Sequence, residues 1–287
     1  MKRTAETCGV QIDSEFETRY EWLRPGQLNE RKSQCPLVLF PLGPLEYHGP
    51  HMPLGTGPLN ATFVAHECCR RLGKGVVLPT MYVGTERERD PDMLESLGFK
   101  RDDYVVGMDF PPRQWNSHYL PEEVFALLVA AETRCLIGQG YKYIFIVNGH
   151  GAFNHNAVLK RLCIEFSNTT PAQVDFAIGF PEQAAASGAI GHADIAEASL
   201  IMHYSEAAVD VRALPPKGVP LKYADFSVVN GEGFIASKPD HLVPEEYDPR
   251  NANAQLGKGH FETTIAEVCG KIERLVSGEG NHAGKVY

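Results

Sequence analysis

The sequence predicts an α/β protein, a three-layer α/β/α sandwich built on a mostly parallel central sheet. Short, continuous apolar runs, typical of strands that are buried on both faces, alternate along the chain with segments of helical periodicity. An alternation of strand and helix implies crossover connections, which place helices on both faces of a parallel sheet. The 287 residues, 43% of them hydrophobic, suffice for one large core, so we expect a single domain over residues 1–287.

The first half of this domain follows the order strand, loop, helix, strand. Residues 1–34 are charged and irregular, and we expect them to wrap the surface or to meet a partner subunit. A buried strand is predicted at 35–41 because this run is almost entirely apolar. A helix follows at 60–72, and the next strand is expected at 75–83. The apolar side of that helix would be formed by Phe63, Val64, Cys68 and Leu72.

A long segment at 84–119 separates the two halves and holds three prolines. Long connections that follow strands are commonly functional lids or contacts between subunits. We therefore expect this insertion to be a lid or an oligomer contact. Its charge run from Glu86 to Asp90 is interpreted first as a solvated face with local ion pairs. The alternative is that Arg87 or Arg89 binds substrate at the rim of a crevice.

The second half repeats the alternation. The clearest helix is at 121–138, where a proline and acidic residues mark the start and a glycine marks the end. A strand is predicted at 141–147, a helix at 154–166 and a fourth strand at 174–179. The last helix is expected at 263–277, where apolar residues recur at helical spacing.

Composition excludes several functional classes. The formal net charge of −9 and the absence of a Lys/Arg block argue against a nucleic-acid surface. No stretch approaches the length of a membrane span, and no apolar segment follows the two positive charges at the amino terminus. We expect a cytoplasmic protein without membrane association. The seven cysteines include no CxxC pair, so we expect reduced thiols with packing roles.

The segment directly after the first predicted strand carries metal-ligand chemistry. Glu46 and His48 are two positions apart, so in an extended segment their side chains leave the same side and can converge on one ion or on two neighbouring ions. Prolines and glycines around them forbid a helix and restrict the loop to few shapes. The alternative is a hydrogen-bonded loop without a ligand. The metal-site interpretation is favoured because His150, between Gly149 and Gly151, follows another predicted strand. Two strand ends of one parallel sheet face the same crevice.

A third group lies further along the chain. His192 and Glu197 fall near the start of a helix-like segment after the fourth predicted strand, a position that suits proton transfer. Asp194, between them, is interpreted as the N-cap of that segment.

These motifs together resemble the creatininase family of metal-dependent amidohydrolases. The resemblance spans about residues 35–205 and rests on the order and spacing of three motifs: the stretch at 43–55, the Asn-Gly-His-Gly at 148–151, and His192 followed by the Glu-Ala-Ser at 197–199. It implies a three-layer α/β/α domain, often assembled as a hexamer, with a site for one or two metals that hydrolyses a small cyclic amide or a formamide.

The resemblance also assigns roles to residues. Glu46 and His150 would hold the first metal and His48 the second, His192 would handle protons near the substrate, and Glu197 would support the site. It implies a divalent ion, zinc or manganese, with iron also compatible. The partner would be a small-molecule amide, and the chain would form a homo-oligomer. The expected substrate contacts are Gly151, His51 and Arg87.

Two positions depart from the family pattern. An aspartate that bridges the two metals would stand nine positions after the first histidine, where this chain has Gly57, which cannot coordinate through a side chain. A glutamate found in creatininase itself is replaced by Ala152. Strict creatinine hydrolysis is therefore not expected, and the second ion should be the weaker one. On this pattern, a Gly57→Asp substitution is expected to restore binding of the second ion.

Three functional hypotheses follow. The first is a metal-dependent hydrolase that cleaves a small amide or formamide with metal-activated water. The second is a catalytically impaired homologue that acts as a binding or assembly protein, and Gly57 is its main support. The third is a generic doubly wound α/β protein with surface histidines. Metal content after purification separates the first two, and the third predicts no effect of any metal on stability.

Overall fold

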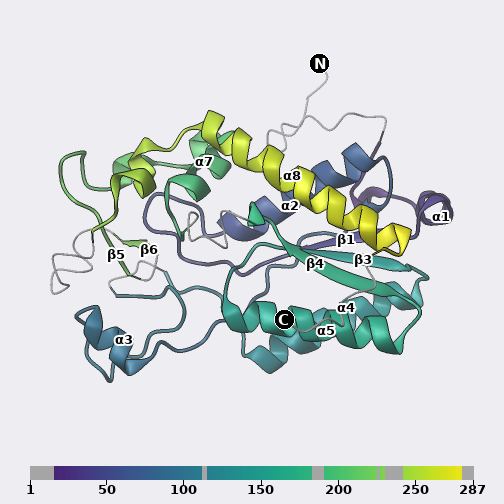
Figure 1. Cartoon of the computed structure of the whole chain (residues 1–287), viewed down its shortest axis with the longest axis horizontal. Coiled ribbons are helices and arrows are strands. Elements are labelled where there is room, and N and C mark those ends of the chain that lie inside the picture. Colours follow the sequence, from purple (N-terminus) through teal and green to yellow (C-terminus); the bar gives the residue numbers. More distant parts are fainter. Residues whose placement is uncertain (1–15, 112–114, 183–190, 225–226, 230–241, 280–287) are drawn as a thin grey trace, which may run out of the picture.

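The computed structural model describes residues 16–111, 115–182, 191–224, 227–229 and 242–279 (Figure 1). Four parallel strands form the central sheet: β1 Leu37–Leu42, β2 Val76–Val77, β3 Tyr143–Asn148 and β4 Gln173–Ile178. Their order is β2-β1-β3-β4, so successive connections leave the β1–β3 pair in opposite directions. In parallel sheets, ligands bind beyond the carboxyl ends of the strands at such a switch point.

Helices cover both faces of this sheet, as the alternating pattern predicts. On one face lie α2 Thr56–Leu72 and α8 Ala254–Ser277, and on the other lie α4 Glu122–Gly138 and α5 Phe153–Thr169 (Figure 1). Alternate strand residues point to the two layers: Val38, Phe40, Leu42, Ile144 and Ile146 to α4 and α5, and Leu37, Leu39, Phe145 and Val147 to α2 and α8. The predicted three-layer sandwich is confirmed.

The remaining elements surround these layers. They are the helices α1 Pro25–Gln34, α3 Pro91–Ser96 and α7 Ile195–Tyr204, and the antiparallel pair β5 Lys222–Ala224 and β6 Ser227–Val229. Short 3-10 turns lie at Tyr20–Trp22, Glu206–Ala208, Val211–Ala213, Glu245–Tyr247 and Pro249–Asn251. Among the described residues, no helix is long and apolar enough to cross a membrane.

The largest differences from the predicted element boundaries are at β2, α2 and α8. The strand expected at 75–83 is reduced to β2, because Pro79 has no N–H for the ladder, although Met81 still forms an isolated bridge to Leu42. Helix α2 begins four residues early, since Pro58 falls in its first turn, where the missing N–H costs nothing. Helix α8 begins at Ala254 with Asn253 as N-cap, nine residues before the predicted start.

The two segments that flank the core have defined contacts. The described part of the amino-terminal segment runs beside β2, where the backbone N–H of Val77 donates to the Thr18 carbonyl at 2.8 Å. The insertion at 84–119 carries α3 and a small apolar cluster of its own, and its far end binds the loop after β1: His118 N donates to the Leu45 carbonyl at 2.7 Å. The expected roles as a wrap and as a lid or oligomer contact stay predictions.

Candidate functional site

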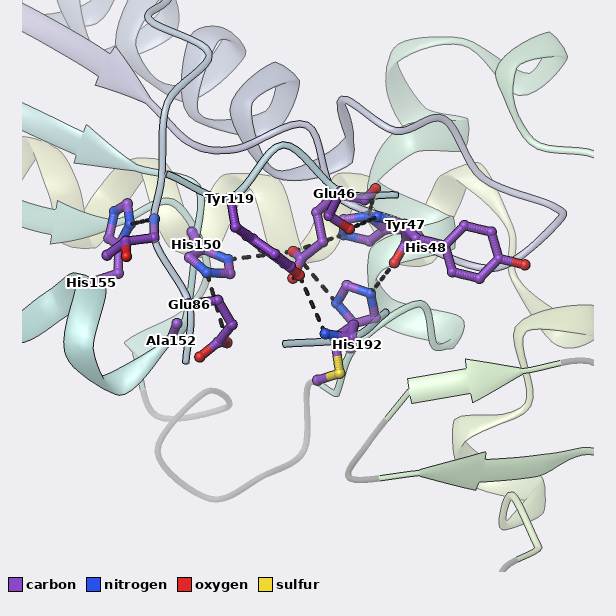
Figure 2. Close-up of polar contacts among 12 residues, drawn as sticks. Glu46, Tyr47, His48, Glu86, Tyr119, His150, Ala152, His155 and His192 are labelled. Carbon is purple, nitrogen blue, oxygen red and sulfur yellow. Dashed lines mark hydrogen bonds and ion pairs between the residues drawn. The ribbon is translucent and has the colours of Figure 1, made fainter. Parts of the chain in front are cut away.

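The candidate site lies beyond the carboxyl ends of β1 and β3, which end level with each other because Leu42 pairs with Asn148 (Figure 2). The loop after β1 carries Glu46 and His48, and it is held closed by a hydrogen bond from Glu46 N to the Leu54 carbonyl at 2.8 Å. The loop after β3 carries His150. Asn148 fixes that loop, because its amide nitrogen donates to the His150 carbonyl at 2.7 Å and its amide oxygen accepts from His150 N at 2.9 Å.

Glu46 is the centre of the site and is almost fully buried. Burial raises the pKa of its carboxyl, but the imidazoles of His150 and His192 outweigh that effect, and the pKa ends well below its usual range. The Tyr119 hydroxyl donates to one carboxylate oxygen, Oε1. The other oxygen, Oε2, faces the histidines (Figure 2).

His48 and His192 each turn one ring nitrogen toward this carboxylate. His48 Nδ1 lies 2.8 Å from the Glu46 carbonyl and His192 Nε2 lies 2.6 Å from the Tyr47 carbonyl. A carbonyl oxygen only accepts, so each of these nitrogens carries the hydrogen, and in a neutral ring the other nitrogen has a free lone pair. Burial lowers the pKa of His48 to about 3, so its ring is neutral near pH 7. The other ring nitrogens, His48 Nε2 and His192 Nδ1, lie 3.9 and 3.8 Å from Glu46 Oε2.

These three residues form a potential metal-binding group. One ligand atom from each of Glu46, His48 and His192 lies within 4.8 Å of the other two, and in the described ranges this is the group of three or more His, Cys, Asp or Glu that meets this condition. Two imidazole nitrogens and a carboxylate oxygen thus converge on one point, and these atom types are ligands of divalent cations. The structure places His192, which was expected to handle protons, among the potential ligands, and its role stays a prediction.

His150 contacts the same carboxylate from another side. Its Nδ1 lies 3.3 Å from Glu46 Oε2, and its Nε2, which has no hydrogen-bond partner among the described residues, lies 4.0 Å from Glu86 Oε2. Burial acts to lower the pKa of His150, but Glu46 and Glu86 raise it overall. His150 thus lies between two carboxylates. It contacts Glu46, the residue with which it was expected to hold the first metal. His48, which was expected to hold the second metal, lies in the group with Glu46 and His192.

Glu197 lies beside His48. Its Oε2 lies 3.7 Å from His48 Nε2 and accepts a hydrogen bond from Ala193 N at 2.6 Å. Burial raises the pKa of this carboxyl well above its usual value. Asp194 accepts from the backbone N–H groups of Ala196 and Glu197, which confirms it as the N-cap of α7. Ala193 has a left-handed backbone conformation, with φ 58°. Strained backbones of this kind in residues other than glycine cluster at functional sites.

The expected substrate contacts lie in different surroundings. Gly151 is exposed beside His150, and a Cβ there would meet nothing within 4 Å. His51 is buried, and burial lowers its pKa to about 4. Arg87 is exposed and pairs with Glu122 at 3.2 Å, as the solvated-face interpretation predicts. The Nε of Arg89 donates to the Gly107 carbonyl at 2.6 Å. Substrate binding by any of them stays a prediction.

Gly57, the position of the missing aspartate, is the second residue of α2 and faces the backbone of Gly149. A Cβ at Gly57 would lie 2.0 Å from the carbonyl oxygen of Gly149. Real Cβ atoms do not approach so closely, and a carbonyl oxygen within a fixed loop cannot move aside cheaply. The expectation that Gly57→Asp restores a ligand therefore does not hold on this backbone.

Two site residues were missed at the sequence level. Tyr119 is 73 positions from Glu46, and Glu86 is part of a charge run in which only the arginines were considered. Both belong to the insertion at 84–119. No motif spacing connects them to the histidines, and the signal that could have pointed to them was that the insertion follows a strand whose end faces the crevice.

Comparison with known proteins supports the sequence resemblance. The sequence profile of creatininase, described as creatinine amidohydrolase, matches residues 23–101 and 105–272. Among curated proteins, the search found no match. Several solved structures match this fold, among them three that are each 18% identical in sequence. A putative creatinine amidohydrolase from Bacteroides fragilis NCTC 9343 has a TM-score of 0.60 over 91% of this chain and 96% of its own.

The other two are a mutant creatininase described as Zn-Zn type and a structure described as creatininase Mn. Their TM-scores are 0.62, over 91% of this chain and 99% of that one, and 0.58, over 94% and 100%. These likenesses show that the fold is creatininase-like. Because the family profile covers most of the sequence, including every motif described above, the chain belongs to the creatininase family.

Proposed function

We propose that this protein is a metal-dependent hydrolase of a small amide, either a cyclic amide or a formamide. The observation that carries the proposal is the convergence of two imidazole nitrogens, His48 Nε2 and His192 Nδ1, on the carboxylate of Glu46. Two imidazole nitrogens and one carboxylate oxygen suit zinc or manganese, and iron is also compatible. Support also comes from relatives whose structures are described as zinc and manganese creatininases.

In this proposal Glu46, His48 and His192 hold a divalent cation. Such a cation, when bound, lowers the pKa of a bound water and polarises the amide carbonyl. The remaining residues hold the ligands and the substrate in position and transfer protons. Tyr119 fixes the carboxylate of Glu46, and Asn148 fixes the loop of His150.

Proton transfer is assigned to the carboxyl group of Glu197, which lies beside His48 on the inner side of the site. Glu197 takes the proton of the attacking water and returns it to the departing nitrogen, so the C–N bond breaks as an amine and a carboxylate form. His150, between Glu46 and Glu86, is placed to orient the substrate by a hydrogen bond from its free Nε2. The burial of the group keeps bulk water away from these steps.

The experiment that tests this function combines metal loading with a substrate panel. The purified protein is stripped with a chelator, reloaded with zinc or manganese, and assayed against lactams, cyclic ureides and formamides. We expect turnover of at least one class that disappears on stripping and in His48→Ala. Tyr104→Ala, at an exposed tyrosine, is the control and should keep full activity.

The alternative function is a binding or assembly protein that has lost catalysis. Gly57 favours it, because the backbone at this position excludes the carboxylate that the family pattern places there. A protein that takes up no metal under any reloading condition would support this alternative and exclude the hydrolase. We also propose a cytoplasmic homo-oligomer, with a hexamer as the form that the family resemblance implies.

A further inference from the structure

We propose that the site binds a single divalent cation, and that a close backbone contact between Gly57 and Gly149 closes the place where a second ion would need its ligand. The inference rests on the proposed metal site. It concerns the number of ions, which is set by this chain's own backbone.

The contact is reciprocal. A Cβ at Gly57 would lie 2.0 Å from the Gly149 oxygen and 3.1 Å from the Gly149 carbonyl carbon. A Cβ at Gly149 would lie 2.3 Å from the Gly57 oxygen and 2.8 Å from the nitrogen of Pro58. Neither glycine is among the described residues with positive φ, so both are required by proximity and not by backbone conformation.

Both partners of the contact are held in place. Gly57 lies in the first turn of α2, which packs on β1 and β3 through buried apolar side chains. Gly149 donates its N–H to the Leu42 carbonyl at 2.8 Å, and the next residue is clamped by Asn148. A side chain at Gly57 would therefore have to displace either a helix from the sheet or the β3 loop that carries His150.

The residues that remain supply one group of three ligands. Within residues 16–111, 115–182, 191–224, 227–229 and 242–279, that group is Glu46, His48 and His192. Outside that group, His150 lies 4.0 Å from Glu86 and Glu197 lies 3.7 Å from His48, but neither pair completes a second group of three donors among the described residues. Two donors without a bridging carboxylate do not make a second structural or catalytic site of the usual ligand number.

The test counts ions and compares two matched glycines. Native mass spectrometry of the zinc-reloaded protein gives the number of ions per chain, with His48→Ala as the variant that should lose the ion. Gly57→Asp is compared with Gly26→Asp, because both glycines are the second residue of a helix and a Cβ at Gly26 would meet nothing within 4 Å. An aspartate in a first helical turn is favourable by itself, so the pair isolates the backbone contact.

We expect one ion per chain in the wild type and no second ion in Gly57→Asp. The melting temperature of Gly57→Asp should fall by at least about 5 °C, while that of Gly26→Asp should stay the same or rise. If Gly57→Asp does not fold at all, the contact is confirmed as essential, and the wild-type stoichiometry carries the ion count.

Two ions in the wild type would overturn the inference and leave the proposed hydrolase intact. A second ion in Gly57→Asp, with a melting temperature equal to that of the control, would overturn it as well. No ion in the wild type would overturn both this inference and the proposed function.

Discussion

At the scale of single residues, Glu46 organises the site because four side chains from separate parts of the chain meet its carboxylate. Tyr119 takes Oε1, while His48, His150 and His192 face Oε2. The hydroxyl of Tyr119 is the only direct hydrogen-bond donor to Glu46 Oε1 that is found in the described part of the chain. Partners of this kind orient a ligand and hold its charge without touching the ion.

Tyr119→Phe should therefore weaken metal binding without unfolding the protein. We expect a loss of about 10- to 100-fold in metal affinity, the usual effect of removing a partner behind a ligand. Competition with a coloured chelator measures it. Tyr104→Phe is the control, because Tyr104 is 73% exposed. Equal affinities for the two variants would show that the Tyr119 hydroxyl does not position Glu46.

The sequence predicted much of this residue-level arrangement, for identifiable reasons. Glu46 and His150 meet because each follows a strand of the same parallel sheet, and that placement follows from the order of elements. The grouping of His48 with His192 could not be predicted. It depends on which ring nitrogen is bound to a backbone carbonyl, and that is settled by the path of the loops.

At the scale of elements, close approaches at glycine fix how helices meet. Helix α8 passes α7 at Gly257, where a Cβ would lie 1.9 Å from the Ser199 carbonyl oxygen. The same approach explains why the start of α8 was predicted too late. The sequence there contains Gly257 and Gly259, which weaken the helical signal, yet the helix forms because the contact with α7 favours it.

The pair Gly257→Ala and Gly259→Ala should change stability in opposite directions. Gly257→Ala forces overpacking against α7 and should lower the free energy of unfolding by about 1 to 3 kcal/mol. A Cβ at Gly259 meets nothing within 4 Å, so Gly259→Ala should raise it by up to about 1 kcal/mol. Urea unfolding of both variants makes the comparison. A stabilised Gly257→Ala would contradict the packing of α7 on α8.

The contact between α2 and the amino-terminal segment should make stability depend on pH. His66 on α2 lies with its Nδ1 2.7 Å from the Thr18 hydroxyl. Burial lowers the pKa of His66 to about 4, and the nearby Arg70 and Arg19 add to the shift while Glu17 opposes it. Between pH 6.5 and 4 the unfolded chain binds a proton that the folded chain does not. His66 therefore lowers stability as the pH falls through this range, and has no further effect below it.

His66→Gln should remove this part of the pH dependence. We expect the difference in unfolding free energy between wild type and variant to change by on the order of 2 kcal/mol between pH 7 and pH 4. Chemical unfolding at several pH values gives the two curves. Parallel curves over the whole range would show that His66 titrates normally in the folded protein.

At the scale of the whole molecule, helix α4 carries apolar side chains on both its inner and its outer face. The inner face of α4 packs on the sheet through Phe125 and Val129, while its outer face exposes Val124, Leu127 and Leu128. Apolar residues gathered on one exposed helix face are typical of a contact between subunits. The outer face of α4 is therefore the surface at which we expect the proposed homo-oligomer to form.

Leu127→Glu should reduce the oligomer to smaller species. Leu127 is 64% exposed, so the change should leave the fold of each chain intact. Light scattering coupled to gel filtration gives the mass. Leu242→Glu, at another exposed leucine, is the control and should keep the wild-type mass. A monomeric wild type, or an unchanged mass in Leu127→Glu, would place the contact elsewhere or exclude it.

The contact between Gly57 and Gly149 also limits which substitutions the protein accepts at these two positions. A side chain at either position collides with the backbone of the other, so no single substitution places an aspartate at position 57 without loss of stability. Such an aspartate would require the loop that carries His150 to be rebuilt first. The two positions are therefore constrained together, and a change at either one depends on the backbone path of the other.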